Sequence, residues 1–243
     1  MKITFLGSGD AFGSGGRFQA CIHVETGAVR FLMDCGASSL IAMKRFAVDP
    51  GLVDAILISH LHGDHFGGLP FFILDAQFSR RTRPLTIVGP PGVEARVRDA
   101  MEVLFPRSSR VERRFTTTFK ELQDRTELNV GALSVVPYAV VHPSGAPPFA
   151  LRVAGEGKVV AYSGDTEWTG ALVDAARGAD VFICEAYYFD KPIKYHLDYQ
   201  SLMKHRTQLD CKKLVVTHMS PDMLRRRPDV GIETAEDGKT ILL

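Results

Sequence analysis

The chain has 243 residues, of which 45% are hydrophobic, so it is long enough to bury the core of one large domain. Its 29 lysines and arginines nearly balance its 28 acidic residues. The resulting net charge of +1 excludes a nucleic-acid-binding surface that depends on strong positive charge over the whole molecule. No repeat, linker or low-complexity tract interrupts the sequence, so we expect residues 1–243 to form a single domain.

The cysteines and the first residues indicate in which cellular compartment the protein is expected. None of the four cysteines forms a CxxC pair, and three lie in apolar runs, which is typical of small core residues in a reducing compartment. These are Cys21, Cys35, Cys184 and Cys211. The apolar run at residues 1–7 is too short for a signal peptide or a membrane span. We therefore expect a cytoplasmic protein that makes no contact with a membrane.

Hydrophobic periodicity predicts strands and helices that alternate along the chain. The predicted strands are 2–6, 19–25, 29–34, 55–58, 84–88, 133–141, 149–153, 159–163, 181–184, 214–217 and a closing strand within 235–242. The predicted helices are 38–46, 69–78, 93–104, 170–176 and 199–209.

A glycine-rich segment, residues 7–16, separates the first predicted strand from the second. One interpretation is a dinucleotide-binding turn, but the glycine spacing does not match that fingerprint and strands rather than a helix follow. The alternative is a loop that faces an active site.

The stretch 59–68 directly follows a predicted buried strand and contains three histidines and an aspartate. His60 and His62 are two residues apart, so on an extended chain their side chains point to the same side and can share one ion. Asp64 and His65 follow in a predicted turn and can hold a second ion. The three glycines of the stretch would let the backbone bend tightly around the ions. A strand that ends in these donors indicates a metal site rather than a solvated histidine-rich loop.

This HxHxDH motif is the signature of the metallo-β-lactamase superfamily, which the chain resembles from its first residue to its last strand. The resemblance implies an α/β fold, the four-layer αββα sandwich. In that superfamily a distant histidine, an aspartate and a last histidine complete a two-metal site, and the matching residues here are His142, Asp165 and His218. The motif together with Ser163-Gly164-Asp165-Thr166 most resembles the ribonuclease Z and small phosphodiesterase branch.

The resemblance implies a ligand set for two divalent metal ions. His60, His62 and His142 would hold one ion and Asp64, His65 and His218 the other, with Asp165 bridging both. Nitrogen and oxygen donors without a thiolate favour Zn²⁺, with Mn²⁺ or Fe²⁺ as alternatives. Two ions roughly 3.5–4 Å apart would share a water whose pKa a single zinc lowers to about 7. A metal-bridging hydroxide would then be the nucleophile, and no side-chain nucleophile is needed.

The resemblance also implies catalytic residues beyond the metal ligands. His196 matches a histidine that contacts the scissile phosphate and aids the leaving group, and Glu185 matches the glutamate that orients it. Asp64 is expected to be a catalytic residue as well as a metal ligand. Asp34 matches an aspartate that supports the metal site from behind, although an aspartate at this position could equally cap the following helix.

Several other side chains have open interpretations. His23 and His205 are expected to be structural or surface residues. Trp168 either walls the substrate pocket or packs in the core. A group of arginines forms a solvated face, flanks an anionic substrate or lies at a homodimer interface. These are Arg80, Arg81, Arg83, Arg107, Arg110, Arg113 and Arg114.

We expect a dinuclear metal-dependent hydrolase, and within that class a phosphodiesterase acting on a small or cyclic phosphodiester. The alternatives are a ribonuclease Z-like tRNA 3′ endonuclease, a lactonase or thioesterase of the same fold, and a metal-free scaffold protein. Bacterial ribonuclease Z grips tRNA with an exosite arm inserted between the positions that match His142 and Asp165. Here residues 143–164 provide only a turn and two predicted strands, so we expect no arm and favour a small-molecule substrate over nucleic acid.

Overall fold

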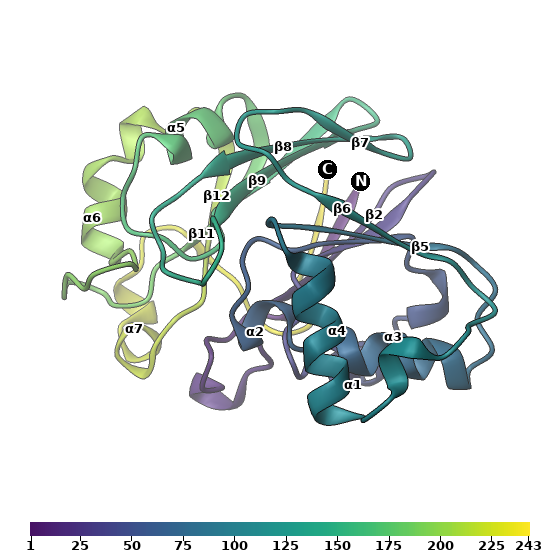
Figure 1. The fold of residues 1–243 in the computed structure, drawn as a ribbon. Helices are drawn as coiled ribbons and strands as arrows, with labels where there is room; N and C mark the ends of the chain where they lie inside the picture. The colour runs from purple at the N-terminus through teal and green to yellow at the C-terminus, as the bar shows by residue number, and fades with distance from the viewer.

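In the computed structural model, which describes residues 1–243, two seven-stranded mixed sheets lie face to face (Figure 1). Sheet 1 contains, in spatial order, β14 (Thr240–Leu242), β1 (Lys2–Gly7), β2 (Cys21–Glu25), β3 (Arg30–Met33), β4 (Ala55–Leu57), β5 (Leu85–Gly89) and β6 (Thr117–Glu121). Sheet 2 contains β13 (Glu233–Thr234), β12 (Cys211–Thr217), β11 (Ala179–Glu185), β10 (Lys158–Tyr162), β9 (Phe149–Gly155), β8 (Leu133–Ala139) and β7 (Leu128–Val130).

Helices cover the outer face of each sheet, which gives the expected αββα sandwich (Figure 1). Sheet 1 carries α1 (Ser39–Arg45), α2 (Gly63–Phe66), α3 (Leu69–Phe78) and α4 (Val93–Leu104). Sheet 2 carries α5 (Ala171–Ala176), α6 (Tyr199–Lys204) and α7 (Pro221–Arg225). Five single turns of 3₁₀ helix are η1 (Ser14–Gly16), η2 (Pro50–Leu52), η3 (Ser108–Arg110), η4 (Arg206–Gln208) and η5 (Arg227–Asp229). None of the helices has both the length and the apolar character needed to cross a membrane.

The central strands are apolar on both faces because each sheet is covered on both sides. In β11, Val181 and Ile183 enter the core between the sheets, whereas Phe182 and Cys184 pack against the outer helices. Burial of each such large apolar side chain contributes about 1.5–3 kcal/mol. The near-continuous apolar runs that predicted these strands are therefore a direct consequence of the four-layer arrangement.

The parallel strands of both sheets end at the same edge of the sandwich. Strands β3 to β6 are mutually parallel in sheet 1, and β10 to β13 are mutually parallel in sheet 2. The two sheets are tied at this edge, where the backbone N–H of Phe149 donates to the carbonyl of Ser59 at 2.9 Å. Residues that follow β4, β10 and β12 therefore meet, although they lie far apart in the sequence.

The structure confirms most predicted elements, and helices 69–78 and 93–104 have the predicted bounds. The helix predicted at 199–209 is too long, because α6 ends at Lys204 and a separate 3₁₀ turn follows. His205 between them has φ −102° and ψ 5°, which is not helical. The sequence analysis missed β6, β7, β13, α2 and α7, which are short or half-exposed and so lack a clear apolar period.

The arginine group does not have one common role. Arg81 is only 6% exposed, and its guanidinium donates to five backbone carbonyls, including those of Val53 and Pro84. It therefore stabilises the turns around η2 and β5, so all three interpretations of the group are wrong for this residue. Arg83 pairs with Asp54, while the homodimer interpretation of the exposed arginines stays a prediction.

All four cysteines are free thiols, and Cys21, Cys35 and Cys184 are buried. Burial raises the pKa of Cys21 to about 12 and that of Cys184 in the same direction. Their thiols therefore stay protonated and unreactive, as expected of small core residues.

His23 is a structural residue, as predicted, and its burial makes the free energy of unfolding depend on pH. The residue is 3% exposed and neither ring nitrogen has a hydrogen-bond partner. Burial lowers the pKa of His23 from 6.5 to about 4. Between these values the unfolded chain binds a proton that the folded chain excludes, so stability is lost as the pH falls through this window.

We expect His23→Leu to reduce this loss by on the order of 1–3 kcal/mol, because leucine fills similar space and does not titrate. Urea unfolding of both proteins at several pH values across the window measures the effect. Parallel pH profiles for the wild type and the variant would contradict the assignment.

Candidate metal centre

The HxHxDH stretch leaves the end of β4 and enters α2 directly. His62 lies on extended chain, whereas Asp64 and His65 lie within α2 rather than in the predicted turn. The glycines of the stretch allow backbone segments to pack closely, more than they allow the backbone to bend tightly as predicted. A Cβ at Gly68 would lie 2.3 Å from the carbonyl oxygen of Gly36, so only glycine allows this approach, whereas a Cβ at Gly63 would meet nothing.

His60, His62 and His142 form the first cluster, with their ligand atoms within 4.8 Å of one another. The closest pair is Nε2 of His142 and Nδ1 of His62, at 3.0 Å. The Nδ1 of His142 is 2.8 Å from the carbonyl oxygen of Tyr195, to which it donates. That bond fixes the tautomer and leaves the Nε2 lone pair directed at the other two rings.

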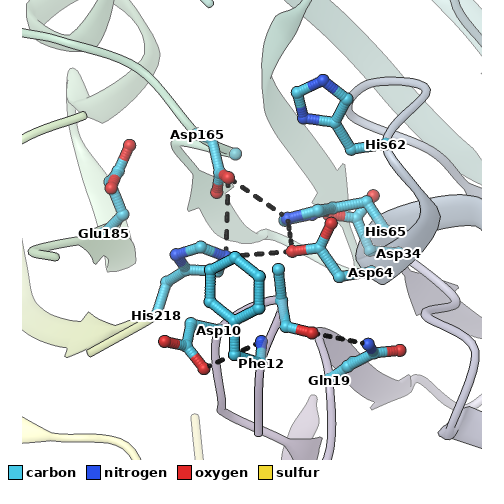
Figure 2. A network of polar contacts seen from close by, with 12 residues as sticks. Asp10, Phe12, Gln19, Asp34, His62, Asp64, His65, Asp165, Glu185 and His218 are labelled. Atoms are coloured by element: carbon cyan, nitrogen blue, oxygen red, sulfur yellow. Dashed lines mark hydrogen bonds and ion pairs between the residues drawn. The ribbon is translucent and has the colours of Figure 1, made fainter. Parts of the chain in front are cut away.

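Asp64, His65, Asp165 and His218 form the second cluster (Figure 2). The Nε2 of His65 lies 3.1 Å from Oδ2 of Asp64 and 3.4 Å from Oδ2 of Asp165. The Nε2 of His218 lies 3.3 Å and 3.4 Å from the same two oxygens. Two imidazoles and two carboxylates thus converge on one point.

Asp165 lies between the two clusters and is 2% exposed. Its Oδ2 is 3.9 Å from Nε2 of both His60 and His142 in the first cluster. The same oxygen is within 3.4 Å of both histidines of the second cluster, and its Oδ1 has no hydrogen-bond partner. A carboxylate in this place can contact an ion in either cluster.

Asp34 supports the centre from behind, as one of its two interpretations predicted. Its Oδ1 accepts from the backbone N–H of Ser59 at 2.7 Å, and its Oδ2 accepts from Oγ of Ser59 at 2.8 Å and from Nδ1 of His65 at 2.7 Å. The helix-capping interpretation is wrong, because Ser38 occupies the N-cap position of α1. Asp34 therefore orients His65 so that Nε2 faces the cluster.

The charges of the centre fit a divalent metal ion. Burial opposes charge on His65, but the carboxylates of Asp165, Asp64 and Asp34 outweigh it and raise the pKa of His65 well above its usual value. Burial likewise opposes charge on Asp165, yet His218, His65 and His60 hold its pKa well below its usual value. Nε2 of His60 and Nε2 of His65 are buried without a hydrogen-bond partner. Unpaired imidazole nitrogens facing buried carboxylates are the donor set that Zn²⁺ and related ions bind.

His196 and Glu185 lie beside the second cluster. Nδ1 of His196 is 3.1 Å from Oε2 of the fully buried Glu185 and 3.9 Å from Oδ2 of Asp165. Burial opposes the charge of His196, but Glu185 and Asp165 outweigh it and raise its pKa. Because Asp165, Glu185, His196 and His218 also lie within 4.8 Å, this group could itself hold an ion.

The glycine-rich segment forms a loop beside the centre rather than a dinucleotide-binding turn. The carbonyl of Ser8 accepts from the backbone N–H of His218 at 3.2 Å and from the hydroxyl of Thr217 at 3.3 Å. No α-helix follows the loop, which contains only η1. The active-site interpretation of this segment is therefore the one the structure supports.

Trp168 packs rather than walling the pocket. Its ring stacks on His205 with centroids 4.1 Å apart and contacts the apolar cluster under α5 and α6. Tyr187, which the sequence analysis did not single out, lies at the centre instead. Its ring is 5.1 Å from that of His196 and 6.1 Å from that of His218. Its position two residues after Glu185, just past the end of β11, was the signal that could have identified it.

Comparisons with known proteins agree with this geometry. The sequence profile of the family described as anti-Pycsar protein Apyc1 matches residues 1–239. The chain belongs to this family. A ribonuclease Z of Agathobacter rectalis is 26% identical to this Apyc1-family chain over 277 residues, covering 93% of it and 89% of the relative.

One further protein and one solved structure are also similar to this chain. An uncharacterized protein of Mycobacterium tuberculosis is 31% identical over 228 residues, covering 91% of the Apyc1-family chain and 81% of the relative. The crystal structure of human tRNase Z, short form, matches it with a TM-score of 0.80 and 24% identity over 100% of this chain and 99% of that one. The Apyc1-family chain is thus a metallo-β-lactamase-superfamily member of the ribonuclease Z-like and phosphodiesterase branch, as its motifs predicted.

We expect Asp34→Asn to lower metal affinity by about 10- to 100-fold, because the amide can no longer accept from His65 and both groups of Ser59 at once. Titration of the metal-free protein with Zn²⁺ against a competing chelator measures the change. Asp54→Asn is the matched control, because Asp54 accepts from the backbone N–H of Arg30 away from the centre. Equal affinity in both variants would show that Asp34 does not support the centre.

Proposed function

We propose that the chain is a dinuclear metal-dependent phosphodiesterase that hydrolyses a small or cyclic phosphodiester. The observation that carries this proposal is the position of His196, a histidine held by Glu185 at the border of two nitrogen and oxygen clusters. The clusters alone suit several hydrolytic reactions. A cationic imidazole beside them suits an anionic substrate with a poor leaving group.

The proposed ligands are His60, His62 and His142 for one ion, Asp64, His65 and His218 for the other, and Asp165 for both. Zn²⁺ is the metal we expect, with Mn²⁺ or Fe²⁺ as alternatives. When bound, such ions lower the pKa of water and neutralise charge on a phosphoryl oxygen. The chain supplies the orientation, since Asp34 and the carbonyl of Tyr195 fix His65 and His142.

His196 is the proposed general acid. Its Nδ1 is held by Glu185, so the proton available for transfer is the one on Nε2, which makes no hydrogen bond to the protein. The same contact favours the protonated ring. That proton can pass to the leaving oxygen, or remain on Nε2 and stabilise charge on the phosphate. Glu185 is the proposed positioning residue for this step, and Asp64 acts through the second ion.

A small substrate is proposed because the chain provides little surface for a long one. Between His142 and Asp165 lie only the loop 140–148 and strands β9 and β10, which leaves no projecting arm. The balanced charge also limits the phosphate contacts that supply most affinity for nucleic acid. The names of relatives called ribonuclease Z keep tRNA 3′ processing as the second candidate.

We expect His196→Ala to keep both metal ions and to lose about 10²- to 10⁴-fold in kcat, the range for a general acid or a charge stabiliser. Asp165→Ala is the contrasting variant and should lose metal as well as activity, because it removes the carboxylate shared by both clusters. Metal analysis after dialysis and turnover of a p-nitrophenyl phosphodiester measure the two effects. Loss of metal in His196→Ala would mean that His196 is a ligand.

The proposed substrate size predicts that kcat/KM for a small or cyclic phosphodiester exceeds that for a precursor tRNA. Both substrates are assayed with the same enzyme preparation loaded with Zn²⁺ or Mn²⁺. A lactone and a thioester in the same panel test the two ester-hydrolysing alternatives. Faster 3′ processing of the tRNA than of every small diester would replace the proposed function with ribonuclease activity.

A further inference from the structure

Phe12, in the glycine-rich loop, is 84% exposed and is the most exposed aromatic side chain in the protein. Isolated exposed apolar residues are common and need no explanation by themselves. The backbone around Phe12, however, is held by an unusual number of side-chain contacts, and the loop that carries it adjoins the metal centre.

Two buried or half-buried side chains fix this loop. The carboxylate of Asp10, which is 0% exposed, accepts from the backbone N–H of Phe12 at 3.2 Å and from the N–H and hydroxyl of Ser14 at 2.9 Å and 2.6 Å. Nε2 of Gln19 donates to the carbonyl of Ala11 at 3.0 Å. The exposed ring is therefore presented by a pinned backbone, which lowers the entropy lost when a ligand contacts it.

The same contacts place the loop beside the centre. Gln19, which holds Ala11, also packs at Gly36, where a Cβ would lie 2.7 Å from its Cβ and 2.2 Å from the carbonyl oxygen of Asp64. Figure 2 shows the ring of Phe12 in front of the contact between His218 and Asp64. The ring of Tyr187 lies on the other histidines of this end, His196 and His218. A phosphate at the clusters would thus lie beside the ring of Tyr187 and near the loop that carries Phe12.

We propose that Phe12 is a specificity-determining residue whose ring stacks on the nucleobase of a nucleotide-derived phosphodiester. This inference rests on the proposed phosphodiesterase function and names the part of the substrate that the metal clusters do not contact. Every base has a π-face, so stacking on phenylalanine selects for the presence of a base and tolerates its identity. The contact adds binding energy remote from the reacting phosphate, so its loss raises KM more than it lowers kcat.

The test compares two diesters with the same leaving group, thymidine 5′-p-nitrophenyl phosphate and methyl p-nitrophenyl phosphate, on the metal-loaded enzyme. We expect Phe12→Ala to lower kcat/KM for the thymidine diester by roughly 5- to 150-fold and to change the methyl diester much less. Phe12→Trp should retain the preference for the nucleoside, whereas Phe12→Leu, which is apolar without a π-face, should lose it.

Phe78→Ala is the matched control, because Phe78 is 77% exposed at the end of α3 and should affect neither substrate. Unchanged metal content and circular dichroism would show that Phe12→Ala remains folded. An equal loss for both diesters, or no loss for either, would overturn the stacking role while leaving the phosphodiesterase function intact. Failure of the wild type to hydrolyse either diester would instead overturn the proposed function and the inference with it.

Discussion

Three carboxylates, those of Asp34, Asp64 and Asp165, are buried at one edge of the sandwich, and the rest of the structure has to compensate for their charge. An unpaired buried carboxylate is costly, so each must face a cation or several hydrogen-bond donors. Asp34 is satisfied by Ser59 and His65. Asp64 and Asp165 lie 3.1–3.9 Å from imidazole nitrogens and within 4.8 Å of each other, with Oδ1 of Asp165 unpaired. This arrangement could hold metal ions, whose positive charge would compensate for the carboxylates.

Three of the eight non-glycine residues with a positive φ lie at the same edge. Asp34, His218 and Tyr195 have φ values of 60°, 57° and 70°, in the left-handed region that residues other than glycine rarely adopt. Each lies at the end of a strand or next to a proposed catalytic residue, and each makes a contact that orients the centre. Such strain costs on the order of 1–3 kcal/mol per residue and persists only where surrounding contacts over-determine it. The hydrogen bonds that the carboxylate of Asp34 and the carbonyl of Tyr195 accept provide that constraint.

The sequence predicted the parts of this structure that depend on local pattern. The apolar run before His60 predicted β4, and the spacing of His60 and His62 predicted that they share a side. It could not predict the length of α6, since His205 leaves the helical region without a proline or glycine to mark the end. It also could not identify Arg81 as buried, because the carbonyls that satisfy its guanidinium come from turns that carry no pattern of their own.

Among site residues, the sequence indicated which side chains meet where donor chemistry and strand ends coincide, and left two interpretations open where tertiary contacts alone decide. His142, Asp165 and His218 each follow a strand and are polar residues after an apolar run, so they could be recognised. Asp34 fits both a capping and a supporting role by sequence, and only its contact with His65 distinguishes them. Trp168 was given a pocket interpretation beside core packing because it is close to Asp165 in the chain. Three positions along irregular backbone say little about the direction of a side chain, and the ring of Trp168 stacks on His205.

The side chains of the two clusters and the loops around them have separate tasks. This separation would explain how related centres can act on substrates of different size. In the proposed reaction the histidines and carboxylates would contact only the reacting phosphate and its leaving group, so they would not distinguish a tRNA from a small diester. Discrimination has to come from elements that reach the rest of the substrate. In this chain those nearest the clusters are short, namely the loop 140–148 and the pinned loop of Phe12. If the proposed function holds, a site with such short walls would gain its selectivity from the group adjacent to the phosphate.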